Sequence, residues 1–302
     1  MAEPMRQLRL HLGAHKTATT HLQDTLAHHR EALLARGADY LPCEAFRPLA
    51  HRYSRAGTWR MRAWPLMKGR FDRQFEALRR GPGRVLVSDE DLLGYAYDLL
   101  AAPLYARPKA LHVIRHLAGR AETAVFLGIR SFDSLLPSAY AQTLKAVPPP
   151  PGGMARIRAE LARSPPSWAE LADRLAAALP GASLRIWRQE DYRRDWRQIL
   201  DLYAGCPLGP LAELPPPALT RSPSASAVAE AEALDPALPR AERIARVRAI
   251  YAARPAGPEH GSYAPLSLAE TDRLRTRYEE DLEVIRHRHP GMLVETGQSG
   301  SP

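Results

Sequence analysis

The sequence predicts an α/β protein in which a parallel β-sheet is covered by helices on both faces, giving three layers. Short apolar runs alternate along the chain with longer segments whose apolar residues recur at helical spacing. Apolar runs without polar alternation are typical of strands buried on both faces. Strands that alternate with helices form parallel sheets, because each parallel crossover has room for a helix. The predicted strands are residues 8–12, 85–88, 124–129 and 183–187.

Length and composition favour one large globular domain that spans residues 1–302. A chain of 302 residues with 45% hydrophobic content can bury a sizeable core. The formal net charge of +9 favours anionic partners, such as a nucleotide or an acidic sugar. No run of five or more basic residues forms a nucleic-acid tail, so we expect no nucleic-acid partner.

Two cysteines, Cys43 and Cys206, are too few for a disulfide framework and form no C-x-x-C pair. The N-terminus has no apolar signal-peptide core, and no run approaches the roughly 18 apolar residues of a membrane span. We therefore expect a reduced, cytoplasmic protein without a membrane partner. The sequence contains no signal for the oligomeric state.

The first predicted strand leads into the most informative stretch of the chain. It passes through Gly13 into the turn Lys16-Thr17-Ala18-Thr19-Thr20 and on into a helix over residues 19–36. The N–H groups of a first helical turn lack partners inside the helix and carry partial positive charge, so they bind phosphate. Lys16 adds a full charge, the threonines add hydroxyl donors, and Gly13 permits a tight turn. We interpret residues 13–20 as a phosphate cradle, against the alternative of an ordinary polar helix start.

This cradle is not a triphosphate-binding loop of the Walker A type. That motif, G-x-x-x-x-G-K-[ST], requires a glycine directly before the lysine, and His15 stands there. The glycines let the loop bend around a triphosphate. A loop without them is too short to enclose one.

Between the first two predicted strands, residues 42–67 are aromatic and basic without clear periodicity. We expect a loop there, which either stacks against an acceptor or tucks its tryptophans into the core. A helix over residues 71–78 follows, and a Gly-Pro-Gly break at 81–83 precedes the strand at 85–88.

The second half of the chain alternates predicted helices with proline-rich segments. We expect residues 148–166 to form a mobile connection and residues 205–265 to be irregular, apart from one helix. With residues 42–67, these segments are expected to form the acceptor site. The predicted helices are residues 107–118, 134–145, 168–179, 195–203, 240–252 and 268–288.

Polar clusters follow three of the predicted strands: residues 13–20, residues 88–91 and Arg130. Ligands of open parallel sheets bind beyond the carboxyl ends of the strands, so we expect the three clusters to meet. Ser138 stands eight residues after Arg130, which lets a strand-end arginine and a serine of the next helix face one pocket. Alternatively, Arg130 pairs with Asp133 and Ser138 is an ordinary helix residue.

These clusters resemble the motifs of sulfotransferases of the bacterial or glycan type, which use 3′-phosphoadenosine 5′-phosphosulfate (PAPS). Residues 16–20 match their K-[ST]-[GA]-T-[ST] turn, and Arg130 with Ser138, Ala139 and Tyr140 matches their arginine and serine element. The resemblance implies a P-loop NTPase-like sulfotransferase fold. It implies that Arg130 and Ser138 bind the 3′-phosphate of PAPS, and that the 5′-phosphosulfate is bound by Gly13, His15, Lys16, Thr17, Ala18, Thr19 and Thr20.

The resemblance further implies transfer of the sulfuryl group from PAPS to a hydroxyl or amine, which leaves adenosine 3′,5′-bisphosphate (PAP). The acceptor, a small molecule or a carbohydrate, is not encoded in any motif. A sulfonate in transit carries less charge than a phosphoryl group, so we expect no metal. In one departure from the family, its R-K-G type segment near the C-terminus has no clear counterpart, because Arg254-Pro255-Ala256-Gly257 matches it too loosely.

Glu90 is the candidate catalytic base, because Ser88-Asp89-Glu90 resembles the Ser-x-Glu motif of the family. A neutral alcohol is a poor nucleophile and needs a carboxylate within hydrogen-bond reach. Asp89, Asp91 and His15 remain alternatives; Asp89 can instead cap a helix, and His15 can donate to the sulfonate. Lys16 is expected to stabilise negative charge on the leaving phosphate oxygen.

Two other functions fit parts of the pattern. A P-loop kinase with Mg-ATP would use residues 85–89 as its magnesium-binding strand, with Asp89 near the metal. A non-catalytic module that binds anions or nucleic acid would need only the charge of +9.

Overall fold

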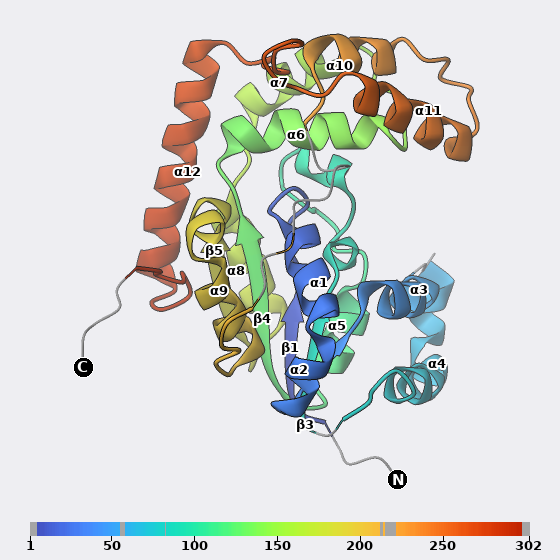
Figure 1. Ribbon diagram of the computed structural model, residues 1–302, viewed down its shortest axis with the longest axis vertical. Helices are drawn as coiled ribbons and strands as arrows, with labels where there is room; N and C mark the ends of the chain where they lie inside the picture. Colours follow the sequence, from blue (N-terminus) through green and yellow to red (C-terminus); the bar gives the residue numbers. More distant parts are fainter. Residues whose placement is uncertain (1–4, 55–57, 82, 212–213, 215–221, 298–302) are drawn as a thin grey trace.

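The computed structural model describes residues 5–54, 58–81, 83–211, 214 and 222–297. Its centre is a sheet of five strands in the order β2-β3-β1-β4-β5, and all neighbouring strands run parallel. Figure 1 shows this sheet between helices on its two faces, so the predicted three-layer α/β fold is confirmed. The strands are β1 (Met5–His11), β2 (Ala38–Leu41), β3 (Gly83–Ser88), β4 (Glu122–Ile129) and β5 (Ser183–Arg188).

Side chains alternate between the two faces of the sheet, as the pleat requires. On one face, Leu8 and Leu10 of β1 belong to the larger apolar core. On the other face, Leu86 of β3 and Phe126 of β4 belong to a second core. Strands β3 and β4 therefore have apolar side chains on both faces, which explains their unbroken apolar runs.

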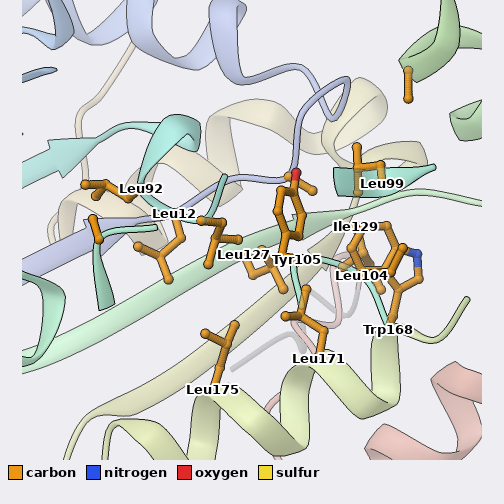
Figure 2. Packing of buried hydrophobic residues seen from close by; sticks show 14 of the residues in the cluster. Leu12, Leu92, Leu99, Leu104, Tyr105, Leu127, Ile129, Trp168, Leu171 and Leu175 are labelled. Atoms are coloured by element: carbon orange, nitrogen blue, oxygen red, sulfur yellow. The ribbon is translucent and has the colours of Figure 1, made fainter. Parts of the chain in front are cut away.

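Different helices cover the two faces. The second core packs against α1 (Thr19–His28), α2 (Arg30–Ala35) and α9 (Gln189–Ala204). The larger core includes residues of α3 (Cys43–Ser54), α4 (Thr58–Glu76), α5 (Leu111–Ala118) and α8 (Trp168–Ala178). Figure 2 shows part of this packing, where Leu171 and Leu175 of α8 lie near Leu127 of β4.

A further group of helices lies beyond the carboxyl ends of the strands, at the top of Figure 1. Helix α12 runs from this group down past α8, and it contacts both α6 and α8. The group consists of α6 (Phe132–Leu144), α7 (Gly153–Arg163), α10 (Ala225–Glu232), α11 (Arg240–Ala253) and the start of α12 (Leu268–Arg288).

The register brings the strand ends to one edge. His11 of β1 pairs with Ser88 of β3 and with Phe126 of β4. Strand β4 continues to Ile129, which pairs with Arg188 of β5. The segments that follow β1, β3 and β4 therefore start at the same edge of the sheet, below the helices at the top of Figure 1.

The structure corrects several predictions of local structure. Residues 42–67 are not a loop, because α3 and most of the first half of α4 lie there, although each helix contains a proline. Residues 148–166 contain α7, and residues 205–265 contain α10 besides α11. Strand β2 was not predicted. The helix predicted at 19–36 is two helices, separated at His29.

In the part of the chain that the structure describes, no helix combines the length and the apolar character that a membrane crossing requires.

Candidate active site

Gly13 begins the cradle, and the structure gives two reasons for a glycine. Its φ of +52° lies in the left-handed region, which glycine adopts without strain. A Cβ at this position would lie 2.9 Å from Thr19 Oγ1 and 3.3 Å from Glu90 Cβ. The missing side chain therefore lets the start of α1 and the acidic segment after β3 approach each other.

The turn itself is held in an unusual backbone conformation. Lys16 and Ala18 have φ values of 70° and 68°, and both are non-glycine residues in the left-handed region. Such residues cost on the order of 1 kcal/mol each and cluster at ligand sites. Ala18 is the N-cap of α1 and has no side-chain cap, so no capping side chain occupies the N–H groups of the first turn. This helix start can bind an anion.

The three threonines of the turn are placed differently. Thr17 is 2% exposed and donates its hydroxyl to the Ala14 carbonyl oxygen at 2.6 Å, so its hydroxyl points into the protein. A Cβ on Gly128 of β4 would lie 2.9 Å from this hydroxyl, so a glycine makes room for it. Thr19 and Thr20 line the cavity above the cradle, whereas Thr17 does not.

Lys16 is a partly buried cation without an ion pair in the described residues. Burial lowers its pKa to about 8, and the nearby charges of Lys145 and Arg130 add to this effect. Arg130 donates from Nε to Ser134 Oγ at 2.7 Å and from a terminal nitrogen to the Lys16 carbonyl oxygen at 3.2 Å. Arg130 thus donates to neutral groups, and neither cation forms an ion pair in the described residues, so the charge of both is available to a ligand.

The alternative pairing of Arg130 with Asp133 is not formed. Asp133 accepts hydrogen bonds from Arg275 at 2.9 Å and from Ser131 Oγ at 2.6 Å instead. Ser138 lies on α6 and lines the same cavity as Arg130 and Lys16. The predicted arginine and serine element therefore faces the cradle.

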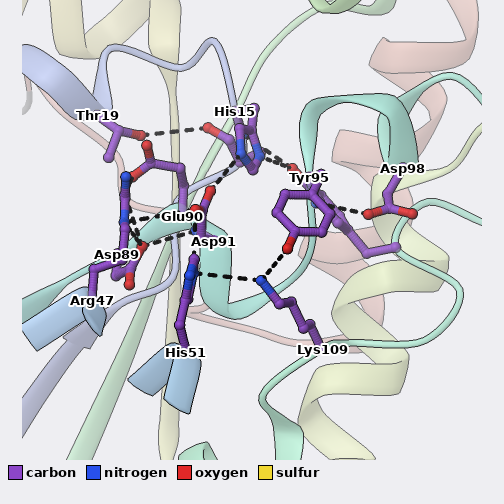
Figure 3. A network of polar contacts seen from close by, with 12 residues as sticks. His15, Thr19, Arg47, His51, Asp89, Glu90, Asp91, Tyr95, Asp98 and Lys109 are labelled. Atoms are coloured by element: carbon purple, nitrogen blue, oxygen red, sulfur yellow. Dashed lines mark hydrogen bonds and ion pairs between the residues drawn. The ribbon is translucent and has the colours of Figure 1, made fainter. Parts of the chain in front are cut away.

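Asp89, the first of three consecutive acidic residues after β3, has a structural environment (Figure 3). It is fully buried, caps the 3₁₀ helix η1 (Glu90–Leu92) through the Asp91 N–H at 3.0 Å, and accepts from Arg47 Nε at 2.9 Å. Burial raises its pKa to about 6, although Arg47 opposes the shift.

Asp91 is held by two histidines. His15 Nε2 lies 3.1 Å and His51 Nε2 lies 3.3 Å from its carboxylate oxygens. Burial favours the neutral acid, but the two histidines and Arg47 outweigh it and lower the pKa of Asp91 below its ordinary value. Neither Asp89 nor Asp91 lines the cavity above the cradle.

Glu90 alone among the three acidic residues lines that cavity. Its Oε2 accepts a hydrogen bond from Gln23 at 2.9 Å and lies 3.0 Å from a terminal nitrogen of Arg47. The same Gln23 amide also donates to the Ser88 carbonyl oxygen at 3.1 Å, which fixes it beneath Glu90. Both contacts use Oε2, so in the described chain Oε1 remains as an oxygen that can accept a proton.

His15 also lines the cavity, but both of its ring nitrogens have protein partners. Nδ1 lies 3.0 Å from the Tyr105 hydroxyl, and Nε2 contacts Asp91. The Tyr105 oxygen already accepts from the His15 backbone N–H at 3.1 Å, so its proton is directed at Nδ1. This network makes Nε2 the protonated nitrogen, and it leaves the ring no free nitrogen to act as a base.

The cavity above the cradle, which we call the cradle cavity, has a volume of about 460 Å³. Most of the predicted site residues line it, and they come from the segments that follow β1, β3 and β4 and from α6. Gly13 and Thr17 shape its floor without lining it. The predicted residues that line it are His15, Lys16, Ala18, Thr19, Thr20, Glu90, Arg130 and Ser138.

The structure adds residues that the sequence did not reveal. Gln23 and Arg47 hold Glu90, and Arg193 and Trp196 of α9 line the cradle cavity. Gln23 had a recognisable signal, because it stands four residues after Thr19 and so shares its face of α1. Arg47 had none, since the sequence predicts a loop where α3 lies.

Within the described residues, His15, Glu90 and Asp91 have ligand atoms within 4.8 Å of one another, a spacing that could hold a metal ion. The two carboxylates also contact nitrogen-bearing side chains. Arg47 lies against Glu90, and His51 lies against Asp91. The Arg47 guanidinium therefore occupies a position from which it balances part of this negative charge.

Searches of family models and of curated proteins find no match. Among solved structures, the fold is similar to that of a sulfotransferase from Alicyclobacillus acidocaldarius, at 15% identity and a TM-score of 0.39. The match covers 72% of this chain and 88% of that protein. This similarity concerns the fold alone.

Proposed function

We propose that this protein is a sulfotransferase that transfers the sulfuryl group of PAPS to a hydroxyl or amine of an acceptor. One observation carries the proposal: the cradle cavity brings together a helix N-terminus with a partly buried lysine, the arginine that follows β4, a serine of α6, and a single carboxylate. These are the groups needed to bind two anionic ends of a nucleotide and to remove one proton.

On the donor side, the first turn of α1 and Lys16 bind the 5′-phosphosulfate. The Lys16 ammonium stabilises the negative charge that develops on the bridging oxygen as the sulfur–oxygen bond breaks and PAP leaves. Arg130 and Ser138 bind the 3′-phosphate, because the arginine fork can pair with two phosphate oxygens. The fit is supported by the two cations that have no acidic partner in the described chain.

On the acceptor side, Glu90 is the general base. As the acceptor oxygen or nitrogen forms its bond to sulfur, Oε1 takes the proton from it. Gln23 and Arg47 act as positioning residues, since they hold Oε2 and so orient the carboxylate. Asp89 and Asp91 have structural roles. Asp89 caps η1 and binds Arg47, and Asp91 contacts two histidines.

The geometry counts against the kinase alternative. Asp89, which would lie near magnesium in a kinase, is fully buried and bound to Arg47. The turn also lacks the glycine that a triphosphate loop needs before Lys16.

The test is calorimetric titration with PAP in the presence of EDTA. We expect the wild-type protein to bind PAP without metal and Lys16→Ala to lose most of the affinity, because the lysine supplies the only full charge of the cradle. Lys68→Ala, an exposed lysine of α4, removes the same charge away from the site and serves as the matched control. Magnesium-dependent ATP binding without PAP binding would contradict the proposal and favour a kinase.

A further inference from the structure

A second cavity of about 360 Å³, which we call the α6 cavity, adjoins the cradle cavity. The two share a wall formed by Lys16, Arg130, Ser138, Gln142 and Ser222. From this wall the α6 cavity extends along α6 to Lys145, and Tyr263 also lines it. Glu90 and the threonines of the cradle do not line it.

The α6 cavity carries unbalanced positive charge. Its lining includes Lys145, for which the described chain offers no carboxylate at ion-pair distance, and its one acidic residue, Asp133, is bound by Arg275. Burial lowers the pKa of Lys145, and the neighbouring Arg248 of α11 lowers it further. Two like charges near each other, without an acid between them, form a favourable environment for an anion.

The position of Lys145 would also suit a purely structural role, but its contacts do not support one. It is the C-cap of α6, where an ammonium group can bind the last carbonyl oxygens of a helix. The Lys145 ammonium makes no such hydrogen bond in the described residues; its recorded contact is the ring of Tyr251, at 5.7 Å. Its hydrogen-bond donors are therefore available to a ligand in the cavity.

We infer that the acceptor carries an anionic group of its own, and that the α6 cavity receives this group with Lys145 as the counter-charge. The inference rests on the proposed function, in which the cradle and Arg130 bind the anionic groups of the donor. The two cavities also share Gln142 and Ser222, which the proposed donor site does not use, so an acceptor whose nucleophile reaches Glu90 can extend along these residues into the α6 cavity. The amide of Gln142 and the hydroxyls of Ser222 and Ser262 suit a polar acceptor.

The test compares two probes of similar size, 4-nitrophenyl β-D-glucuronide and the neutral 4-nitrophenyl β-D-glucoside, by calorimetry with PAP at saturation. The probes differ only in that the glucuronide has a carboxylate where the glucoside has a hydroxymethyl group. PAP occupies the donor groups, so a difference between the probes reports on the acceptor side. We expect the glucuronide to bind wild-type protein about tenfold more tightly, since a charge-assisted contact is involved. Lys145→Gln should remove this preference, Lys145→Arg should keep it, and the affinity for PAP should stay the same in both variants.

Four results have distinct meanings. Equal binding of the two probes to wild-type protein, or an unchanged preference in Lys145→Gln, overturns the inference and leaves the sulfotransferase proposal standing. A loss of PAP affinity in Lys145→Gln of tenfold or more also overturns it, because Lys145 would then serve the donor. Failure of the wild-type protein to bind PAP removes the proposed function itself. Circular dichroism of each variant confirms that the fold is kept.

Discussion

At the scale of single residues, the segment Asp89-Glu90-Asp91 shows how three adjacent carboxylates acquire different roles. Asp89 points into the protein and caps η1, Asp91 is bound between His15 and His51, and only Glu90 reaches the cradle cavity. The chain leaves β3 at Ser88 and turns into the 3₁₀ helix η1 at Glu90, so the three side chains leave the backbone in different directions. The sequence therefore narrows the base to a tripeptide, and the backbone selects one member of it.

This selection leads to a prediction for Glu90→Gln. The amide keeps the shape of the side chain but cannot accept the acceptor proton, so turnover should fall by about two to four orders of magnitude while the affinity for PAP is kept. Steady-state kinetics with any accepted substrate, beside calorimetry with PAP, measures both. Asp89→Asn and Asp91→Asn are the matched controls, and a larger loss in either would assign the base to that residue.

Part of the site could be predicted from residues alone and part could not. The cradle, Glu90, Arg130 and Ser138 follow strand ends, and parallel strands bring their carboxyl ends to one edge. Arg47 and Lys145 reach the site from α3 and α6, and their position depends on how those helices pack across the sheet. A sequence pattern records which face of a helix is buried, but not the neighbour against which it packs.

At the scale of elements, prediction succeeded where the pattern was regular. The range predicted for α12 agrees with the structure, and the four predicted strands are present, because long amphipathic helices and buried apolar runs give strong signals. The failures have local causes. Strand β2 has only four residues and includes Asp39, which accepts hydrogen bonds from the backbone of Arg80 and Gly81. Helices α3 and α4 were not predicted over residues 42–67 because Pro48 and Pro65 lie inside them, and prolines usually interrupt helices. Helix α7 was not predicted because a run of prolines precedes it.

The contact between α8 and α12 helps to fix the backbone of the candidate site. Asp281 of α12 is fully buried and accepts from Ser167 Oγ at 2.8 Å and from the Trp168 N–H at 2.6 Å. The Trp168 indole in turn donates to the Arg130 carbonyl oxygen at 2.9 Å. One carboxylate thus fixes the start of α8, and α8 fixes the backbone that carries Arg130.

We predict that Asp281→Ala lowers the free energy of unfolding by about 3 kcal/mol, because it leaves a buried N–H and a hydroxyl without their acceptor. Urea denaturation measures the change. Glu280→Ala, at the adjacent and exposed position on α12, should change stability by less than about 0.5 kcal/mol. Similar losses in both variants would mean that α12 contributes through its helix and not through Asp281.

At the scale of the whole molecule, the fold concentrates positive charge in one place. The chain has a net charge of +9, and many of its arginines are paired with acids on the surface. Lys16, Arg130 and Lys145 form no ion pair in the described residues, yet all three line the joined cavities at the edge of the sheet. Clefts that collect one sign of charge attract ligands of the opposite sign.

This arrangement of like charges in the candidate active site opposes folding. The pKa of Lys16, lowered to about 8, means that the folded chain holds the proton of this lysine less tightly than the unfolded chain. For such a lysine the penalty on folding is fully present below the folded pKa and fades as the pH rises toward the unfolded value of about 10.4. Lys16→Met should therefore raise the free energy of unfolding at pH 7, by about 1 to 3 kcal/mol, while it abolishes PAP binding. Denaturation at pH 7 and again near pH 10.5, where the gain should shrink, measures how much stability the fold loses by placing this lysine in the proposed donor site.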